Sequence, residues 1–431
     1  MSEIKLILLD PGHFHAALVQ KDMYPAISRR VSVYAPLTGD LLDYLNRIAA
    51  FNLRHDQPTS WELDVHTGPD YFDRMLKEHP GNVVIITGRN RPKMDRIKSS
   101  VHAGINVLAD KPWIIRSADL QKLSDVLNTA EANQLVGYDI MTERYEITSI
   151  LQRELVNDKA LFGELVKGTD TEPAITARSV HHLMKVVAGI PLRRPTWFFD
   201  IDEYGEGLAD VGTHVVDLVQ WTAFPDQALD YKADVRITGA KRWPIEISKV
   251  QFQQVTGVGD FPRELTSHVK DGTLQYYCNN SVNYTLRGTH VGLSILWAWE
   301  APEGQGDVYE ASFRGSKARI ELRQDKNENY KPELYVVPNS PDLQSEVIAA
   351  LKNKVDDLQK SYRGLGFEQR GSEARLTIPD TYRVGHEDHF AQVTRQFFNY
   401  LKSPQSMPGW EKSNMLVKYY ITTKGVEAAT P

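Results

Sequence analysis

The chain has 431 residues, 41% of them hydrophobic, which is enough for two domains that each bury a core. Its formal net charge of −6 gives no excess of lysine and arginine, which a surface that binds nucleic acids or anionic membranes would need. Small molecules are therefore the expected partners. The single cysteine, Cys278, excludes an internal disulfide framework and favours the cytoplasm. No apolar run approaches the ~20 residues of a membrane helix, and we expect a soluble protein without an export signal.

The first part of the chain alternates short aliphatic runs with longer helical patterns. Runs of strand length occupy residues 6–9, 31–35, 63–66, 83–87, 105–108 and 135–138. Helices are expected to open between them near His15, Asp40, Pro69, Pro92 and Ser117. This alternation is typical of βαβ units, so we predict an α/β domain over residues 1–143, built on a Rossmann-type, doubly wound parallel sheet.

After residue 143 the pattern changes to a helix followed by extended segments. A helical stripe covers residues 147–155, and late helices are indicated over 343–358 and 390–401. Segments 282–286, 291–299, 308–313 and 318–322 are separated by turns that contain glycine. We therefore predict an α+β domain over residues 144–431, with a large, mostly antiparallel sheet flanked by helices.

The first strand leads directly into Asp10-Pro11-Gly12-His13-Phe14-His15. A dinucleotide diphosphate binds at such a strand-to-helix turn, but of the three glycines of the usual fingerprint only Gly12 is present. The two imidazoles could donate hydrogen bonds to a diphosphate, and the alternative is a polar turn without a ligand. The second strand is not followed by a carboxylate before Asp40, nor at once by an arginine, so we expect NAD without excluding NADP.

Residues after the later strands join this expected cofactor site, because ligands collect at the carboxyl edge of a parallel sheet. Arg89 and Asn90 could neutralise a diphosphate or be solvated loop residues. The cofactor residues that we predict are Asp10, Gly12, His13, Phe14, His15, Thr87, Arg89, Asn90, Asp110 and Lys111.

The most informative stretch runs from Gly205 to Asp217, where a helix is expected to begin. Asp210 and His214 are four residues apart and therefore share one helical face. The preceding glycines suit a close backbone approach to a ligand, which indicates one wall of an active site. The alternative is a buried aspartate that caps the helix beside a structural histidine.

The triplet Asp110-Lys111-Pro112 after the fifth strand and the motif at residues 205–217 together resemble the glucose-fructose oxidoreductase, inositol dehydrogenase and MocA family. The resemblance spans most of the chain. It extends to a bacterial branch of sugar and glycoside dehydrogenases that share Asp-Pro-Gly-His-Phe-His and Ser-Val-His-His, here residues 10–15 and 179–182. The chain departs from the family pattern in two places. The turn after the first strand has only one of the three fingerprint glycines, and the second strand does not end in the acidic residue that binds the ribose.

The resemblance implies that Lys111, Asp210 and His214 surround the reacting carbinol and the nicotinamide. Histidine titrates near neutrality, so His214 is the expected general base. Asp210 would orient its imidazole, and the Lys111 ammonium would lower the pKa of the substrate hydroxyl.

Five further residues are expected to bind substrate. Arg144 matches a family arginine that either contacts substrate or braces the domain junction. The other four are His181, His182, Trp197 and Asp200. They supply hydrogen-bonding groups and an aromatic ring face suited to a sugar, and the alternative is that they form an ordinary surface loop.

The implied activity is NAD(P)-dependent oxidation or reduction of a secondary hydroxyl of a sugar, glycoside or polyol. The alternatives are an NAD-dependent glycosidase with transient ring oxidation and a non-catalytic sugar- or nucleotide-sensing protein, against which the presence of Lys111 argues. We expect no metal, because Asp210, His214, His181 and His182 form no diagnostic ligand motif. The family also implies a dimer or tetramer through the open face of the second sheet, where the run Leu293–Trp299 would be buried unless it is an internal core strand.

Overall fold

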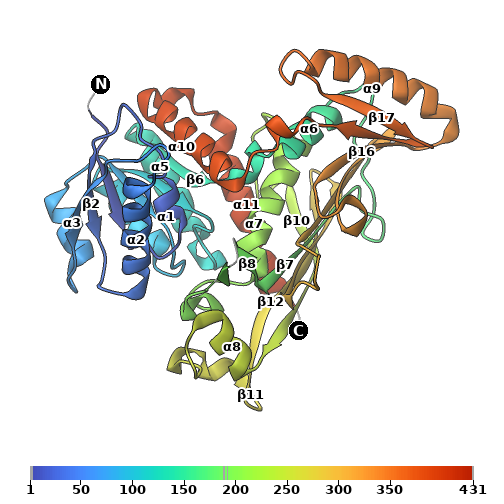
Figure 1. The fold of residues 1–431 in the computed structure, drawn as a ribbon. Coiled ribbons are helices and arrows are strands. Elements are labelled where there is room, and N and C mark those ends of the chain that lie inside the picture. Colours follow the sequence, from blue (N-terminus) through green and yellow to red (C-terminus); the bar gives the residue numbers. More distant parts are fainter. Residues whose placement is uncertain (1–2, 188–189, 192, 430–431) are drawn as a thin grey trace. The chain divides into compact units, whose positions relative to one another are not determined.

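The computed structural model describes residues 3–187, 190–191 and 193–429 (Figure 1). The chain divides into two compact units, Met1–Thr142 with Gly385–Lys412 and Glu143–Val384 with Ser413–Pro431. The first division falls one residue from the expected boundary. Our assignment of all later residues to the second domain misses that the chain returns to the first unit over residues 385–412, a return that no change in composition marks.

The first unit is the predicted doubly wound α/β fold. In its described part the strands form a parallel sheet in the order β3-β2-β1-β4-β5-β6. β1 and β4 lie at the centre with every residue buried, which explains their unbroken aliphatic sequences. The strands are β1 (Leu6–Leu9), β2 (Arg30–Tyr34), β3 (Glu62–His66), β4 (Val83–Ile86), β5 (Asn106–Asp110) and β6 (Gly137–Ile140).

Helices connect these strands as the pattern predicts. They are α1 (His15–Leu18), α2 (Gly39–Leu53), α3 (Tyr71–Glu78), α4 (Lys93–His102) and α5 (Leu120–Ala132). α5 begins three residues after the expected cap Ser117, because a 3-10 turn over Ser117–Asp119 precedes it. α1 has only four residues and is thus too short for a helix-dipole anion site. The later helix α10 (His386–Lys402) packs against α1 and β6.

The second unit is built on the predicted large sheet, whose order is β10-β12-β13-β7-β14-β15-β16-β18-β17, with β11 paired to β12. All these pairs are antiparallel except β13 with β7. The strands are β7 (Ile175–Met184), β10 (Val235–Ile247), β11 (Val269–Lys270), β12 (Thr273–Leu286), β13 (Thr289–Glu300), β14 (Val308–Arg314), β15 (Ala318–Gln324), β16 (Glu333–Pro338), β17 (Gly366–Arg370) and β18 (Glu373–Thr377). A separate two-stranded sheet pairs β8 (Val186–Val187) with β9 (Ile190–Pro191).

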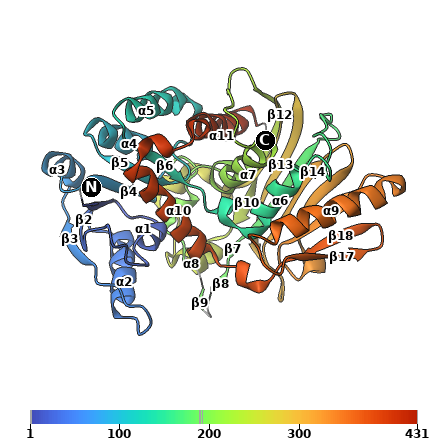
Figure 2. The same cartoon turned by 90° about the horizontal axis from the view of Figure 1, so that it is seen from above.

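Helices cover one face of the large sheet. α6 (Ile147–Val156), α7 (Gly207–Ala223) and α9 (Gln344–Leu358) lie along it in Figure 2, while α8 (Lys249–Thr256) lies near its end. α11 (Gly409–Ala428) begins in the first unit and ends in the second. On β13 the residues Leu293, Ile295 and Trp297 are buried, so alternate members of the apolar run 293–299 belong to the core of this unit.

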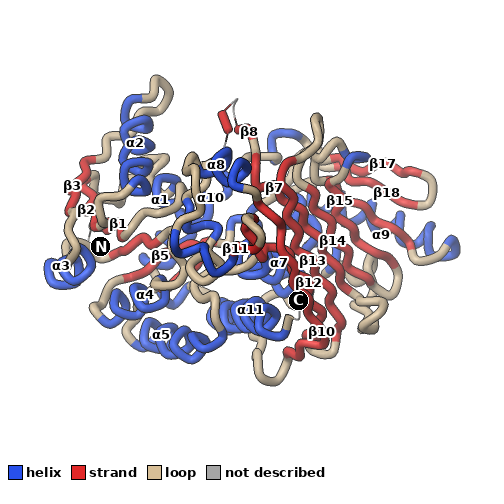
Figure 3. The backbone as a smooth tube through the Cα atoms, turned by 90° about the horizontal axis from the view of Figure 1, so that it is seen from below, coloured by secondary structure: helices blue, strands red, loops and turns tan. Residues whose placement is uncertain are grey.

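The other face of the sheet carries polar side chains, among them Arg178, Ser294 and Glu310. Figure 3 shows the strands of the sheet side by side. This face bears a hollow of about 940 Å³ whose lining includes Arg178, Asn283, Ser294, Glu310 and Arg323. Among the described residues, no helix has the length and apolar character needed to cross a membrane.

Candidate active site

The helix predicted around Asp210 and His214 is α7, which begins at Gly207. A Cβ on Gly207 would lie 2.0 Å from the carbonyl oxygen of Cys278 on β12, and one on Gly212 would lie 3.3 Å from Ile295 Cγ1 on β13. These glycines therefore let α7 approach the sheet closely. At Gly207 this packing takes the place of the close approach to a ligand that we predicted from the sequence.

Asp210 is buried in the first turn of α7, and His214 lies one turn further along at the edge of the buried region. The expected alternative, an aspartate that caps the helix, does not hold, because the N-cap residue is Glu206. Burial raises the pKa of Tyr204 well above its usual value, and the charge of Asp210 and a hydrogen bond to it raise this pKa further. Asp210 thus has a phenol as partner inside the second unit.

Arg194 lies between this carboxylate and the end of β7. Burial lowers the pKa of its guanidinium, and the charges of Asp210 and Asp307 act in the opposite direction. The guanidinium lies 4.5 Å from the ring centroid of Phe198 and 5.3 Å from that of Trp297. It donates hydrogen bonds to the carbonyl oxygens of Leu183 (3.0 Å) and His182 (3.2 Å). A buried cation is therefore held by two rings and the backbone of β7.

His181 and His182, both predicted site residues, converge on Asp307, which precedes β14. The Nδ1 atoms of His181 and His182 lie 3.2 and 2.9 Å from its carboxylate, and Lys185 forms an ion pair with it. Burial alone would raise the pKa of Asp307, but the hydrogen bond from His181 and the charges of His181 and Lys185 hold it well below its usual range. Trp297 lies against the His181 ring, 5.3 Å between centroids.

We expect Asp307→Asn to destabilise the second unit by about 1–3 kcal/mol, because a charged hydrogen-bond acceptor for two imidazoles and an ammonium is lost. The shift of the urea unfolding midpoint at neutral pH measures this. Glu303→Gln is the matched control, since Glu303 is an exposed carboxylate in the same loop. Equal midpoints for the two variants would show that the carboxylate of Asp307 contributes nothing to stability.

Trp197 and Asp200 lie at a 3-10 turn, Thr196–Phe199, and just after it. The Trp197 ring is buried, and its centroid lies 5.7 Å from that of Tyr204, the partner of Asp210. Trp197 therefore packs in the aromatic cluster beside Asp210. Asp200 accepts a hydrogen bond from the backbone N–H of Asp202 (2.9 Å) and shapes the turn.

Arg144 is engaged inside the second unit. Its Nε and one terminal nitrogen donate to the two carboxylate oxygens of Asp217 at 2.6 and 2.7 Å, and Lys418 donates to the same carboxylate at 3.0 Å. All three side chains are buried. This ion pair braces the second unit from within, and the two roles expected for Arg144, substrate contact and bracing of the domain junction, stay predictions.

In the first unit, the predicted cofactor residues lie at the carboxyl ends of β1, β4 and β5. Asp10 has φ +47°, a conformation typical of glycine, and thus keeps the turn that the fingerprint glycine would make. Its carboxylate pairs with Arg96 at 2.5 Å. Gly12 N–H donates to the carbonyl oxygens of Asp10 and Thr87, while Thr87 Oγ1 donates to that of His13.

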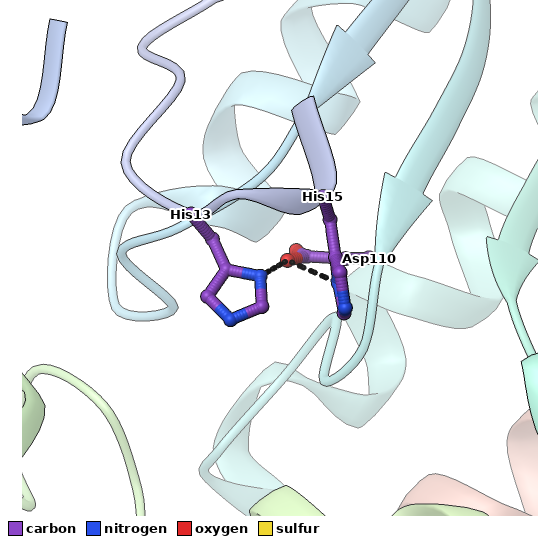
Figure 4. Close-up of side chains that lie close together, drawn as sticks. All are labelled: His13, His15 and Asp110. Carbon is purple, nitrogen blue, oxygen red and sulfur yellow. Dashed lines mark ion pairs between the residues drawn. The ribbon is translucent and has the colours of Figure 1, made fainter. Parts of the chain in front are cut away.

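Asp110 is the centre of a buried polar group in this unit (Figure 4). Lys93, which is 0% exposed, donates to Asp110 Oδ1 at 2.5 Å, to its carbonyl oxygen at 3.0 Å and to Asn90 Oδ1 at 2.7 Å. The other carboxylate oxygen, Oδ2, lies 3.6 Å from His13 Nδ1 and 3.5 Å from His15 Nδ1. The structure therefore brings Asn90 and Asp110 to one lysine that the prediction missed, and it brings His13 and His15 to the other carboxylate oxygen of Asp110.

Lys111 follows Asp110 and precedes a cis peptide bond to Pro112. Burial, the largest cause, and the charges of His389 and Lys111 together lower the pKa of His386 to about 4, so Lys111 lies within electrostatic reach of α10. Phe14 is 37% exposed, and the Arg47 guanidinium lies 5.9 Å from its ring centroid. Arg89, in the loop after β4, is half-buried and its charge lowers the pKa of Tyr71, which burial raises overall.

The edge of this sheet fits a dinucleotide. β1 is flanked by β2 and β4, so the strand order reverses there, which is where doubly wound sheets bind ligands. Gly88 has φ +120°, and a Cβ on it would lie 2.8 Å from the Gly12 Cα. The turns after β1 and β4 therefore meet through two glycines at this edge. Imidazoles, Arg89 and Lys111 supply donors for a diphosphate. β2 ends in Tyr34, whose ring stacks on His66 and whose hydroxyl donates to Glu78 Oε2, and β2 itself carries no acidic residue that would hold a ribose.

Sequence reasoning missed Asp307, Lys93, Tyr204 and Lys185. It also assigned no role to Arg194. By pattern, a lysine in a helix and an aspartate in a turn are ordinary surface residues. Only the fold shows that Lys93 is buried beside Asp110 and that the half-buried Asp307 is the acceptor for His181 and His182.

Comparison with known proteins agrees with this architecture. The family described as "Putative oxidoreductase C terminal domain" matches residues 151–430. The crystal structure of a "putative oxidoreductase" from Parabacteroides merdae ATCC 43184 is 46% identical, with a TM-score of 0.97 over 99% of this chain and 97% of that chain. Among curated proteins, no relative matches the chain.

More distant structures share the fold. KijD10, a 3-ketoreductase from Actinomadura kijaniata crystallised with NADP and TDP-benzene, is 12% identical, with a TM-score of 0.59 over 99% of this chain and 98% of that chain. GenD2 from gentamicin A biosynthesis, crystallised with NAD, is 13% identical, with a TM-score of 0.57 over 100% and 93%. The chain belongs to the oxidoreductase family whose C-terminal domain matches residues 151–430, and it has the fold of the glucose-fructose oxidoreductase, inositol dehydrogenase and MocA superfamily.

Proposed function

We propose that this protein is an NAD(P)-dependent oxidoreductase that oxidises or reduces a secondary hydroxyl of a sugar, glycoside or polyol. The observation that carries the proposal is the placement of Asp210 and His214 on one face of α7, with Asp210 in the electrostatic reach of buried Arg194. The fold agrees, because distant relatives with this fold were crystallised with NADP or NAD.

The cofactor would be held in the first unit by the turns after β1, β4 and β5. The absence of a side chain at Gly88 lets the turn after β4 lie against Gly12, and His13, His15 and Arg89 would donate to the diphosphate oxygens. Because β2 carries no terminal carboxylate, discrimination between NAD and NADP would rest on residues elsewhere in the unit. When bound, the nicotinamide supplies the hydride acceptor or donor.

This chain's residues would manage the proton and the charge. In oxidation, His214 Nε2 or Nδ1 takes the hydroxyl proton of the substrate as general base, and in reduction it returns that proton. Asp210 stabilises the imidazolium that forms, and the Lys111 ammonium hydrogen-bonds the substrate oxygen as negative charge develops on it.

Sugar recognition would use the second unit. His181, His182 and Asp307 offer hydrogen-bonding groups, and the buried Trp297 ring packs against His181. A sugar presents hydroxyl groups at the rim of its ring, which matches these polar groups.

The test has two parts. Mass spectrometry of the supernatant after denaturation is expected to detect a bound nicotinamide dinucleotide. A panel of sugars, glycosides and polyols is then expected to change the absorbance of reduced nicotinamide, with turnover lost in Lys111→Met. Lys77→Met is the matched control, because Lys77 is an exposed lysine of the same unit. Formation of a keto-sugar supports the proposal, net hydrolysis of a glycoside indicates the glycosidase, and absence of nucleotide and turnover contradicts an enzyme of either type.

A further inference from the structure

His13, His15 and Asp110 form a group with the composition of a metal site. One atom from each, the two Nδ1 atoms and Asp110 Oδ2, lie within 4.8 Å of one another. Both imidazoles approach the same carboxylate oxygen, as Figure 4 shows. His13 and His15 come from the turn after β1 and the start of α1, and Asp110 is the last residue of β5. These segments are far apart in sequence, and β4 lies between β1 and β5 in the sheet, but all three side chains converge at its carboxyl edge.

The separations suit a shared ion better than direct contact. Nδ1 to Oδ2 distances of 3.5 and 3.6 Å exceed the ~2.7–3.2 Å of a hydrogen bond. With metal–ligand bonds of ~2.1 Å, two ligand atoms lie ~3.0–3.4 Å apart in octahedral or tetrahedral geometry. Closing the two histidine–carboxylate gaps therefore takes a few tenths of an ångström, and the two Nδ1 atoms lie within 4.8 Å of each other.

The neighbouring residues hold all three donors in place. The His15 ring stacks on His386 at 5.4 Å and packs on Phe390 at 5.1 Å, and His13 packs edge-on against His15 at 4.0 Å between centroids. Lys93 binds Asp110 through Oδ1 and the carbonyl oxygen, so Oδ2 is oriented toward the imidazoles. Such outer contacts to a ligating carboxylate are typical of metal centres.

We propose that His13, His15 and Asp110 bind a divalent first-row transition metal ion, with two imidazoles and one carboxylate as its protein ligands. Imidazole donors favour Zn²⁺, Fe²⁺, Co²⁺ or Ni²⁺ over Mg²⁺ and Ca²⁺. Three protein ligands leave at least one position for water or a ligand oxygen, and His13, with 30% of its side chain exposed, gives access from solvent. His13 and His15 are also the residues proposed to donate to the cofactor diphosphate, so metal binding is tested on nucleotide-free protein, where its outcome does not depend on the proposed dehydrogenase function.

The second unit contains another convergent group, Asp200, Asp202 and His268. Its members are half-buried or exposed, and nothing else at the group points to a ligand. This second group could bind an added ion, so the experiment must distinguish its binding from binding at His13, His15 and Asp110.

The experiment is titration of the metal-free and nucleotide-free full-length protein with Zn²⁺ by calorimetry, with Co²⁺ absorption as a second readout. We expect one ion per chain in the wild type and in His268→Gln. We expect affinity to fall more than about 100-fold in His13→Gln and His15→Gln. His102→Gln is the matched control, since it removes an exposed imidazole from the same unit. Affinity should also fall below about pH 6, where imidazoles become protonated.

Because Asp110→Asn would leave buried Lys93 without its carboxylate partner, the histidine variants carry the conclusion and circular dichroism confirms their folding. Zn²⁺ binding that disappears in folded His13→Gln and His15→Gln, while the Co²⁺ d–d bands also vanish, supports the site. The proposal is overturned if the wild type takes up no ion, or if binding persists in both histidine variants and is lost in His268→Gln.

Discussion

Replacing His214 with asparagine is expected to lower kcat by about 10²- to 10⁴-fold, the usual contribution of a general acid–base group. Asparagine keeps a polar side chain of similar reach on α7 but cannot accept the substrate proton. Nucleotide binding should be unchanged, because the residues proposed to hold the cofactor lie in the other unit. The measurement is steady-state turnover of the sugar found in the panel, with nucleotide affinity determined separately.

A matched control for His214 is His290→Asn. His290 is a partly exposed histidine of the same unit whose Nδ1 lies 3.0 Å from Asp170. It should keep wild-type kcat. If His214→Asn also retains wild-type kcat, another group transfers the proton, and the alternative of a structural histidine on α7 is correct.

Replacing Asp217 with alanine is expected to destabilise the second unit by about 3–5 kcal/mol, the usual cost of leaving buried charges uncompensated. Arg144 and Lys418 would then lack the carboxylate between them, with both side chains buried. Urea unfolding at neutral pH measures the effect. Asp226→Ala is the control, because Asp226 pairs with Arg153 but 71% of its side chain is exposed, and we expect at most ~1 kcal/mol there.

The same carboxylate gives the stability a defined pH dependence. Burial alone would raise the pKa of Asp217, but the charges of Arg144 and Lys418 hold it well below its usual range. A carboxylate whose pKa is lower in the folded state stabilises the fold above the unfolded value of ~3.9, and this stabilisation is lost as the pH falls further toward the folded pKa. Below pH 4 the urea midpoint of the wild type should therefore fall more steeply than that of Asp217→Asn. Parallel pH profiles would contradict the argument.

The sequence alone determined both fold classes, because the burial of a strand or helix dictates which of its own residues are apolar. Strands enclosed on both faces, such as β1 and β4, must be aliphatic throughout, and helices that cover a sheet must repeat apolar residues at helical spacing. Local pattern also found the helix of Asp210 and His214, since two residues four apart share a face whatever surrounds them. The local pattern could not predict that residues 385–412 return to the first unit, because an amphipathic helix such as α10 has the same pattern whichever sheet it packs on.

The partners of the candidate site residues were decided only by the tertiary structure. Asp307 reaches His182 across 125 positions, Arg144 reaches Asp217 across 73, and Lys418 reaches Asp217 across 201. Lys93 and Asp110 meet because β4 and β5 are adjacent, so that α4 starts beside the end of β5. A charged side chain has the same identity in water and in the core, and its neighbours there come from distant segments. The sequence therefore determined which elements form, and the packing of those elements determined which charges are buried together and what each one binds.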